Sequence, residues 1–325
     1  MSPDHRALTT VPSPSRTRTR ILLYVLAFIA VAFWGASFAA TKIALDQLFP
    51  TTLVFLRTSI GILVLATVAL ATRSFRVRLT IPWVQLLILG FLGVAFHQWV
   101  QAQGLQSTSA TDTGWIIATI PIFVALLGWR FLGERMHPVR ITGIVFGAFG
   151  VIVVISDGQV LGFFQGLVDQ LGNAYILLSA INWAVFTVVS KRWLFAGPSI
   201  DARMGSDEGS SFRYMIQAML RLMIMGWILM IPWVVGQAPI NALKTLSSSA
   251  LGALIFLGVA CSGLAYIFWY AALTRLEATE TSALLYLEPL VTQAVAWSCL
   301  GEPLTLGIVI GGCVILLGVW MVGRK

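Results

Sequence analysis

The sequence consists mainly of long apolar runs separated by short polar connections. Ten of these runs have close to the roughly 20 residues that an α-helix needs to cross the hydrocarbon core of a bilayer. They cover residues 21–45, 50–71, 82–103, 111–131, 138–156, 171–194, 212–235, 248–273, 279–299 and 304–323. The longest connection is the polar stretch 195–211. This pattern predicts an all-α integral membrane protein with ten transmembrane helices.

The composition agrees with a lipid environment. Of the 325 residues, 58% are hydrophobic and only 10% are charged, whereas a soluble domain carries about 25% charged residues. The net charge of +8 does not indicate a nucleic-acid partner, because the basic residues lie in short loops rather than on one helical face. We therefore expect membrane lipid, and no nucleic acid, around this chain.

Cofactor and metal signals are absent from the sequence. The three cysteines lie inside apolar runs without a Cys-x-x-Cys pair, and the three histidines are far apart in sequence. No Gly-x-x-x-x-Gly-Lys loop for ATP occurs. The sequence therefore predicts no disulfide framework, no metal site and no cofactor.

The distribution of basic residues predicts the orientation. The first apolar run is too long for a signal-peptide core, so we expect a retained helix preceded by a disordered cytoplasmic tail, residues 1–20. With this tail inside, the predicted inside segments hold seventeen Lys and Arg residues, whereas the predicted outside loops hold Lys244. Basic residues accumulate on the cytoplasmic side. Both termini are therefore expected in the cytoplasm, with the bacterial inner membrane as the expected location.

An internal repeat divides the chain into two five-helix units, residues 21–156 and 171–323. A shift of 168 positions aligns the later part of each unit without a gap. The pairs include Pro121 with Pro289, Leu132-Gly133-Glu134 with Leu300-Gly301-Glu302, Gly143 with Gly311, and Gly150 with Gly318. A weaker match places Trp34 on Trp183 and Arg57 on Arg221. Because five spans is an odd number, the second unit must have the inverted orientation, which is typical of secondary transporters.

These repeated motifs resemble the EamA domain of the drug/metabolite transporter superfamily. The segment Phe33-Trp34-Gly35-Ala36-Ser37-Phe38, followed by Lys42 and Arg57, also resembles the opening helices of that family. The resemblance covers about residues 25–323. It implies a ten-helix exporter of amino acids, related metabolites or drugs, and it leaves the substrate open.

Four of the charged residues inside the predicted spans stand out, because an ionisable group within the bilayer costs roughly 2.5–3.5 kcal/mol on insertion scales. Lys42 and Arg57 lie near the predicted outer side, and Arg221 lies near the inner side. We interpret them as basic groups that meet a carboxylate-bearing solute from either side. The alternatives are snorkelling to the headgroups for Lys42 and structural pairing with helix carbonyls for the arginines.

Glu288, the fourth charged residue, lies in the middle of a predicted span, and its repeat partner is the apolar Ile120. The following Pro289 frees the carbonyl of Leu285, which is tolerated in a membrane only beside protein or a wet cavity. Intramembrane carboxylates of this kind form proton relays in transporters. We therefore expect Glu288 to be a proton-coupling group, and the alternative is an ion pair with Arg57 or Arg221.

His97 and Gln101 lie one turn apart on the third predicted helix and share a face. They are predicted to hydrogen-bond a polar solute, and an interhelical hydrogen bond is the alternative for His97. Their repeat counterparts, Ala265 and Trp269, do not have the same polarity. The sequence therefore predicts an asymmetric substrate cavity.

Aromatic residues are predicted to form the other side of this cavity. The candidates are Trp34, Trp99, Tyr266 and Trp269. Such a lining suits amphipathic or aromatic cargo. The alternative is an interfacial belt, where tryptophan is common in membrane proteins.

Two further repeated features have a structural interpretation. Glu134 and Glu302 end the Leu-Gly-Glu triplets, and their symmetry favours a shared role at a helix end. The glycines of 138–156 and 304–323 have Gly-x-x-x-Gly spacing, which indicates close helix packing. Homodimer formation through these glycines is the alternative.

The sequence therefore favours a non-enzymatic secondary transporter that exports small metabolites such as amino acids or amphipathic compounds, with proton coupling as an option. An uptake permease of the same fold is the first alternative. An integral-membrane enzyme or lipid-handling protein and a non-transporting scaffold are the others.

Overall fold

The computed structural model describes residues 14–76, 79, 81–132, 137–156, 158, 171–194, 208–273, 276 and 284–323, and all regular elements in these ranges are helical. The first part contains α1 (Pro14–Leu45), α2 (Pro50–Ala71), η1 (Ser74–Arg76), α3 (Trp83–Gly90), η2 (Phe91–Phe96), α4 (His97–Leu105), α5 (Ala110–Ile117), α6 (Ile120–Leu132) and α7 (Pro138–Ile155). The second part contains α9 (Leu171–Leu194), α11 (Glu208–Val234), η4 (Val235–Gln237), α12 (Pro239–Lys244), α13 (Ser248–Phe256), η5 (Leu257–Leu264), α14 (Ala265–Leu273), η6 (Leu284–Leu287), α16 (Glu288–Leu300) and α17 (Leu306–Gly323). The prediction of an all-α chain therefore holds for the described residues.

Eight helical stretches among the described residues are long and apolar enough to cross a membrane. They correspond to the first eight predicted spans. The helix Leu306–Val322 is also apolar but shorter, and the predicted span 279–299 is described only from residue 284 onward. The chain is thus a multi-helix membrane protein, and the count of ten spans stays a prediction.

The N-terminal boundary differs from the expected one. Residues 1–20 were expected to be disordered, but α1 begins at Pro14, and residues 1–13 lie outside the described part of the chain. Proline is well suited to the first turn of a helix because its missing N–H would have no intrahelical partner there. Helix propagation from the long apolar run is cooperative. The run therefore extends the helix into the polar residues before it.

Two of the spanning stretches contain a π-helical segment. In the third stretch η2 joins α3 to α4, and in the eighth stretch η5 joins α13 to α14. A shift of 168 positions carries Phe91–Phe96 onto residues 259–264, which lie within Leu257–Leu264. Segments of this kind are frequent at functional sites, because the extra residue per turn changes the direction of nearby side chains.

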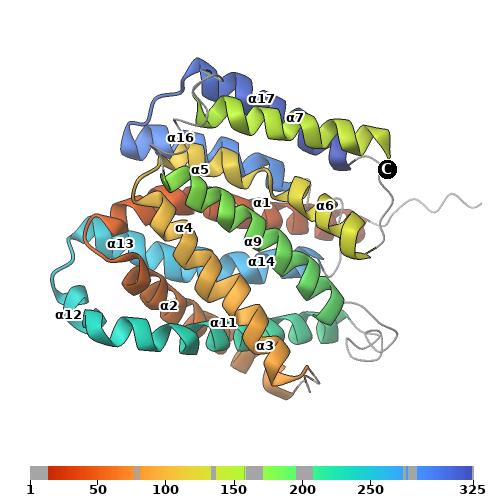
Figure 1. The fold of residues 1–325 in the computed structure, drawn as a ribbon. Coiled ribbons are helices and arrows are strands. Elements are labelled where there is room, and N and C mark those ends of the chain that lie inside the picture. Colours follow the sequence, from red (N-terminus) through yellow and green to blue (C-terminus); the bar gives the residue numbers. More distant parts are fainter. Residues whose placement is uncertain are drawn as a thin grey trace, which may run out of the picture.

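The helices α7 and α17 lie side by side at the edge of the bundle (Figure 1). A Cβ atom added to Gly143 would lie 2.6 Å from the carbonyl oxygen of Gly318, and one added to Gly150 would lie 2.8 Å from that of Gly311. The two helices are therefore antiparallel, and glycine allows their backbones to touch. The close helix packing predicted from the Gly-x-x-x-Gly spacing is confirmed, and it joins these two helices of one chain.

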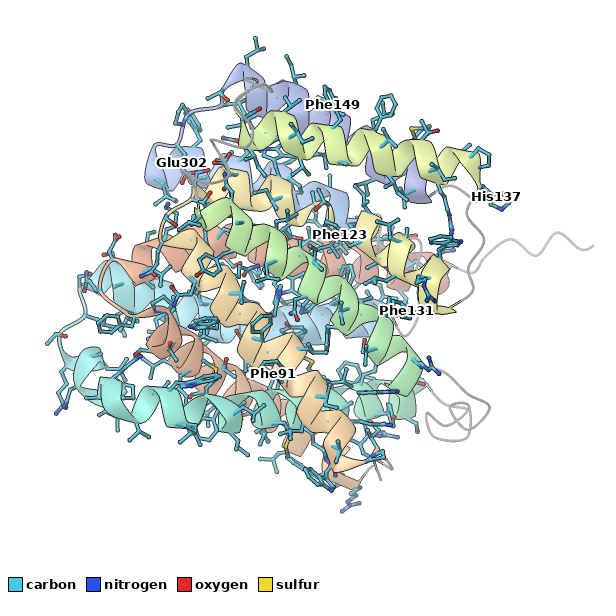
Figure 2. The ribbon with its side chains drawn as sticks, in the orientation of Figure 1. Phe91, Phe123, Phe131, His137, Phe149 and Glu302 are labelled. Atoms are coloured by element: carbon cyan, nitrogen blue, oxygen red, sulfur yellow. The ribbon has the colours of Figure 1, made fainter. Side chains whose placement is uncertain are left out.

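The connection between α16 and α17 contains Glu302, which faces the first turn of α5 (Figure 2). Its carboxylate oxygens accept hydrogen bonds from the backbone N–H groups of Ala110 and Thr111, both at 2.9 Å. These N–H groups have no partner within their own helix, and the helix dipole favours a negative charge there. The predicted helix-end role of Glu302 is confirmed, whereas Glu134 lies outside the described residues.

The glycine contact between α7 and α17 leads to a stability prediction. Gly150→Ala should lower the thermal stability of the detergent-solubilised protein by several degrees, because overpacking typically costs 1–3 kcal/mol and the new Cβ meets backbone. Gly252→Ala is the matched control, since a Cβ added there has nothing within 4 Å. Size-exclusion chromatography after heating measures the folded fraction. Equal stability of the two variants would contradict the tight contact.

Candidate functional site

A cavity of about 200 Å³ lies inside the helix bundle. Its walls come from segments spread over both halves of the chain. It is lined by Trp34, Ser37, Phe38, Arg57, His97, Gln98, Gln101, Ile117, Ala118, Ile120, Pro121, Trp183, Cys261, Tyr266, Trp269, Leu285 and Glu288. The volume is below the roughly 300–1,000 Å³ of sites for drug-sized ligands, so the cavity suits a small solute.

Two interrupted helices contribute to the wall of this cavity. The turn at Ala118–Thr119 separates α5 from α6, just before Pro121. The 3₁₀ segment η6 changes to the α-helix α16 at Glu288, just before Pro289. Each proline lacks the N–H needed for a continuous helix. In a membrane, backbone interrupted in this way is tolerated where it is buried in protein or lines a cavity.

Arg57 extends from α2 into the cavity and is only 6% exposed. Its Nε donates to the hydroxyl oxygen of Ser262 on η5 at 3.2 Å. The two helices approach closely here, because a Cβ added to Gly61 would lie 2.7 Å from the Cβ of Ser262. Among the described residues, no hydrogen bond or ion pair occupies the two terminal nitrogens of Arg57. They are therefore available to a carboxylate or another oxygen acceptor.

Glu288 is the first residue of α16 and lines the same cavity. Its helix packs directly on α1, where a Cβ added to Gly35 would lie 2.9 Å from the backbone oxygen of Glu288. Thr292 fixes this contact by donating to the Gly35 carbonyl at 3.0 Å. Within the described residues the Glu288 carboxylate has no ion pair and no hydrogen-bond partner. The alternative of an ion pair with Arg57 or Arg221 is therefore not realised there.

His97 and Gln101 line the cavity from α4. The Nδ1 atom of His97 lies 3.0 Å from the hydroxyl oxygen of Ser179 and 3.3 Å from its carbonyl oxygen, both on α9. His97 thus makes the interhelical contact that was its alternative role, and the centre of its ring lies 4.6 Å from that of Trp183 at a tilt of 40°. The neighbouring Gln98 has a buried Oε1 atom that meets no hydrogen-bond partner among the described residues. An N–H group of a bound solute would satisfy this oxygen.

Three aromatic residues form a cluster on another side of the cavity. The ring of Trp34 lies 5.4 Å from that of Trp269 and 5.6 Å from that of Tyr266. Trp34 is held by its indole N–H, which donates to the Cys261 carbonyl at 3.2 Å. The three residues are half-buried, and all of them line the cavity. The site therefore combines opposite charges with a wide aromatic surface.

Three predicted site residues lie away from this cavity. Lys42 donates to the carbonyl of Thr108 at 2.6 Å. Trp99 lies beside Phe96, with 6.5 Å between the rings. Arg221 bonds to Gln217 of its own helix: with the amide oxygen turned toward it, the distances are 3.2 Å from Nε and 3.1 Å from Nη2. The other seven predicted residues, Trp34, Arg57, His97, Gln101, Tyr266, Trp269 and Glu288, share the cavity.

Sequence reasoning missed two residues of this lining, one polar and one aromatic. Each is the repeat partner of a residue that had been selected as a site candidate. Trp183 is the counterpart of Trp34 in the weaker match, and the shift of 168 makes Gln98 the counterpart of Tyr266. Both pairs line the cavity. Mapping each selected residue onto its repeat partner would have found both. Elsewhere in the described residues, no three His, Cys, Asp or Glu side chains come together as a metal site.

Comparison with known proteins gives consistent results over nearly the whole chain. The sequence profile of the EamA-like transporter family matches residues 21–156 and 170–324. An uncharacterized transporter of Archaeoglobus fulgidus is 27% identical over 93% of this chain and 97% of its own length. A probable terminal-alkyne amino-acid exporter of Streptantibioticus cattleyicolor is 28% identical over 91% and 92%. A probable amino-acid metabolite efflux pump of Escherichia coli is 26% identical over 91% and 93%.

A solved crystal structure also has this fold. It superposes with a TM-score of 0.60 at 19% identity and covers 92% of this chain and 97% of that one. The family profile matches both halves of the sequence, and the apolar helices make the chain a multi-pass membrane protein. The chain belongs to the EamA-like transporter family.

Proposed function

We propose that this transporter exports small zwitterionic metabolites, such as amino acids, through the cavity described above. The observation that carries the proposal is the presence of Arg57 and Glu288 in one cavity without a bond between them. A solute with a carboxylate and an ammonium group would satisfy both charges at once. The aromatic cluster would contact its apolar part. The solute is bound and released without chemical conversion.

We further propose that ten helices form two inverted five-helix repeats around this cavity. The lining supports the proposal, because it contains residues that the shift of 168 relates to each other. The pairs are Gln98 with Tyr266, Gln101 with Trp269, Ile117 with Leu285, and Ile120 with Glu288. The glycine contact is reciprocal as well, since Gly143 meets Gly318 and Gly150 meets Gly311. A pseudo-two-fold axis through the cavity accounts for both observations, as in other inverted-repeat carriers.

The direction of transport is proposed from the relatives and from the charge distribution. Two relatives are named as an exporter and an efflux pump. The basic loops support cytoplasmic termini and an inner-membrane location. Glu288 then provides a proton-binding carboxylate, so that proton entry drives solute exit. In this scheme Lys42, Trp99 and Arg221 do not touch the solute.

The role of Arg57 is tested by Arg57→Gln in proteoliposomes. The affinity for amino acids should fall by about ten- to hundredfold, because hydrogen bonds to a charged group are lost. The methyl ester of the same amino acid, which has no carboxylate, should lose much less. Arg221→Gln is the matched control, since it removes an intramembrane arginine that lies outside the cavity. Equal effects of the two variants would remove Arg57 from the site.

The role of Glu288 is tested by Glu288→Gln, which keeps the shape of the side chain but replaces the carboxyl group that can bind and release a proton. Accumulation of amino acid driven by a pH gradient should be lost, whereas exchange of labelled for unlabelled amino acid without a gradient should persist. Glu302→Gln is the control for a carboxylate outside the cavity, and its gradient response should remain. Gradient-driven transport by Glu288→Gln would exclude this residue as the coupling group.

The proposed orientation is tested by reporter fusions in a bacterial host. Alkaline phosphatase joined after Lys244 should be active, because this enzyme folds outside the cytoplasm. Green fluorescent protein joined after Lys325 should fluoresce, because it folds inside. The opposite result at either position would contradict the predicted arrangement of the loops.

A further inference from the structure

A second, smaller cavity adjoins the first on the far side of the aromatic cluster. It has a volume of about 60 Å³. Trp34, Trp183, Tyr266 and Trp269 line both cavities. The remaining lining of the smaller one is Leu89, Gly93, Val94, Phe186, Met219 and Leu222. We infer that this second cavity, here named the apolar subsite, receives an aliphatic side chain of the transported amino acid; this inference rests on the proposed function.

The chemistry of the two cavities is complementary. The first holds the charged and amide groups, including Arg57 and Glu288. The apolar subsite is lined by apolar and aromatic residues, and its polar side-chain groups are the indole N–H groups and the Tyr266 hydroxyl of the shared residues. An apolar void of this kind binds apolar groups readily because it holds no well-bonded water that must be displaced. A solute with one charged end and one aliphatic end therefore fits the pair of cavities.

One wall of the apolar subsite comes from two tightly packed helices, with Leu89 on α3 and with Met219 and Leu222 on α11. Leu89, Met219 and Leu222 are 0%, 5% and 3% exposed. α3 and α11 touch at Gly90 and Gly226, where a Cβ added to Gly90 would lie 2.8 Å from the nitrogen of Gly226. The far end of the subsite is therefore fixed by backbone contact, and its depth is set by the side chains of α11.

Gly93 on η2 sets the position of a further wall. A Cβ added to this glycine would lie 2.6 Å from the ring of Phe186. The phenyl ring therefore lies directly on the π-helical backbone. In turn Phe186 packs against Trp183, with 5.0 Å between the rings, and Trp183 faces both cavities. The apolar subsite is thus connected to the charged cavity through a continuous aromatic wall.

The entrance to the apolar subsite is formed by side chains that keep some exposed surface. Trp34, Trp183, Tyr266 and Trp269 are all half-buried, in contrast to the fully buried leucines at the far end. We place the entrance at these four residues because they line both cavities. The length of the aliphatic chain, rather than its charge, would then determine how well different amino acids bind.

The test uses a series of linear amino acids that differ by one methylene: alanine, 2-aminobutyrate, norvaline, norleucine and 2-aminoheptanoate. Their affinities are measured by competition with a labelled member in proteoliposomes. For the native chain, affinity should rise about fourfold per methylene until the subsite is full, and then fall. Leu222→Ala should move this optimum to a longer chain, and Leu222→Phe should move it to a shorter one. Alanine should bind all three proteins alike.

The matched control is Leu220→Ala. Leu220 is 2% exposed on the same helix but lines neither cavity, so this variant should keep the native optimum. Val94→Ala provides a second enlargement of the subsite if Leu222→Phe does not fold. An unchanged optimum in both Leu222→Ala and Val94→Ala would overturn the inference while leaving amino-acid transport intact.

Two further outcomes distinguish failure of this inference from failure of the proposed function. If the subsite variants change the transport rate of every member by the same factor, the small cavity belongs to a moving gate and the inference is wrong. If the native protein binds no member of the series, the proposed function itself fails. A shifted optimum with native alanine binding supports both.

Discussion

The placement of Arg57 and Glu288 inside a lipid-embedded bundle is the constraint on which the rest of the site depends. A charge in this environment must be solvated by protein or by water in a cavity. Arg57 obtains one partner from Ser262, and Glu288 begins a helix at an interruption. Both charges then face a common cavity. The glycine contacts, the π-helical segment and the proline break all contribute to this arrangement.

Helix positions and cavity residues were predictable from sequence to different degrees. Two predicted spans, 50–71 and 171–194, agree with α2 and α9 at both ends. The helix α1 begins at Pro14, ahead of the predicted span 21–45, since a polar extension can continue a helix that an apolar run has already formed. The π-helical segments carry no periodic signal in the sequence and were not expected.

The site residues show the limit of reasoning from helix position alone. Arg57 and Lys42 were selected by the same argument, namely charge within a predicted span. Arg57 points into the cavity, but Lys42 reaches the carbonyl of Thr108. The difference depends on which side of each helix meets a neighbour, and this is set by tertiary packing. The internal repeat indicates which residues line the cavity better than the composition does, because paired positions such as Gln98 and Tyr266 reach the same cavity.

The asymmetry between paired positions also has a physical reason. If Ile120 were a second carboxylate opposite Glu288, two like charges would face one small cavity, and their repulsion would disfavour ionisation of both. A single carboxylate opposite a single guanidinium keeps the cavity close to neutral and leaves each charge available to a zwitterion. The reciprocal glycine contacts between α7 and α17 need no such difference, because they are made by backbone. Symmetric packing and asymmetric chemistry therefore serve different requirements in the proposed transporter. The first would let the two halves share one architecture, and the second would let the cavity distinguish the two ends of a zwitterionic solute.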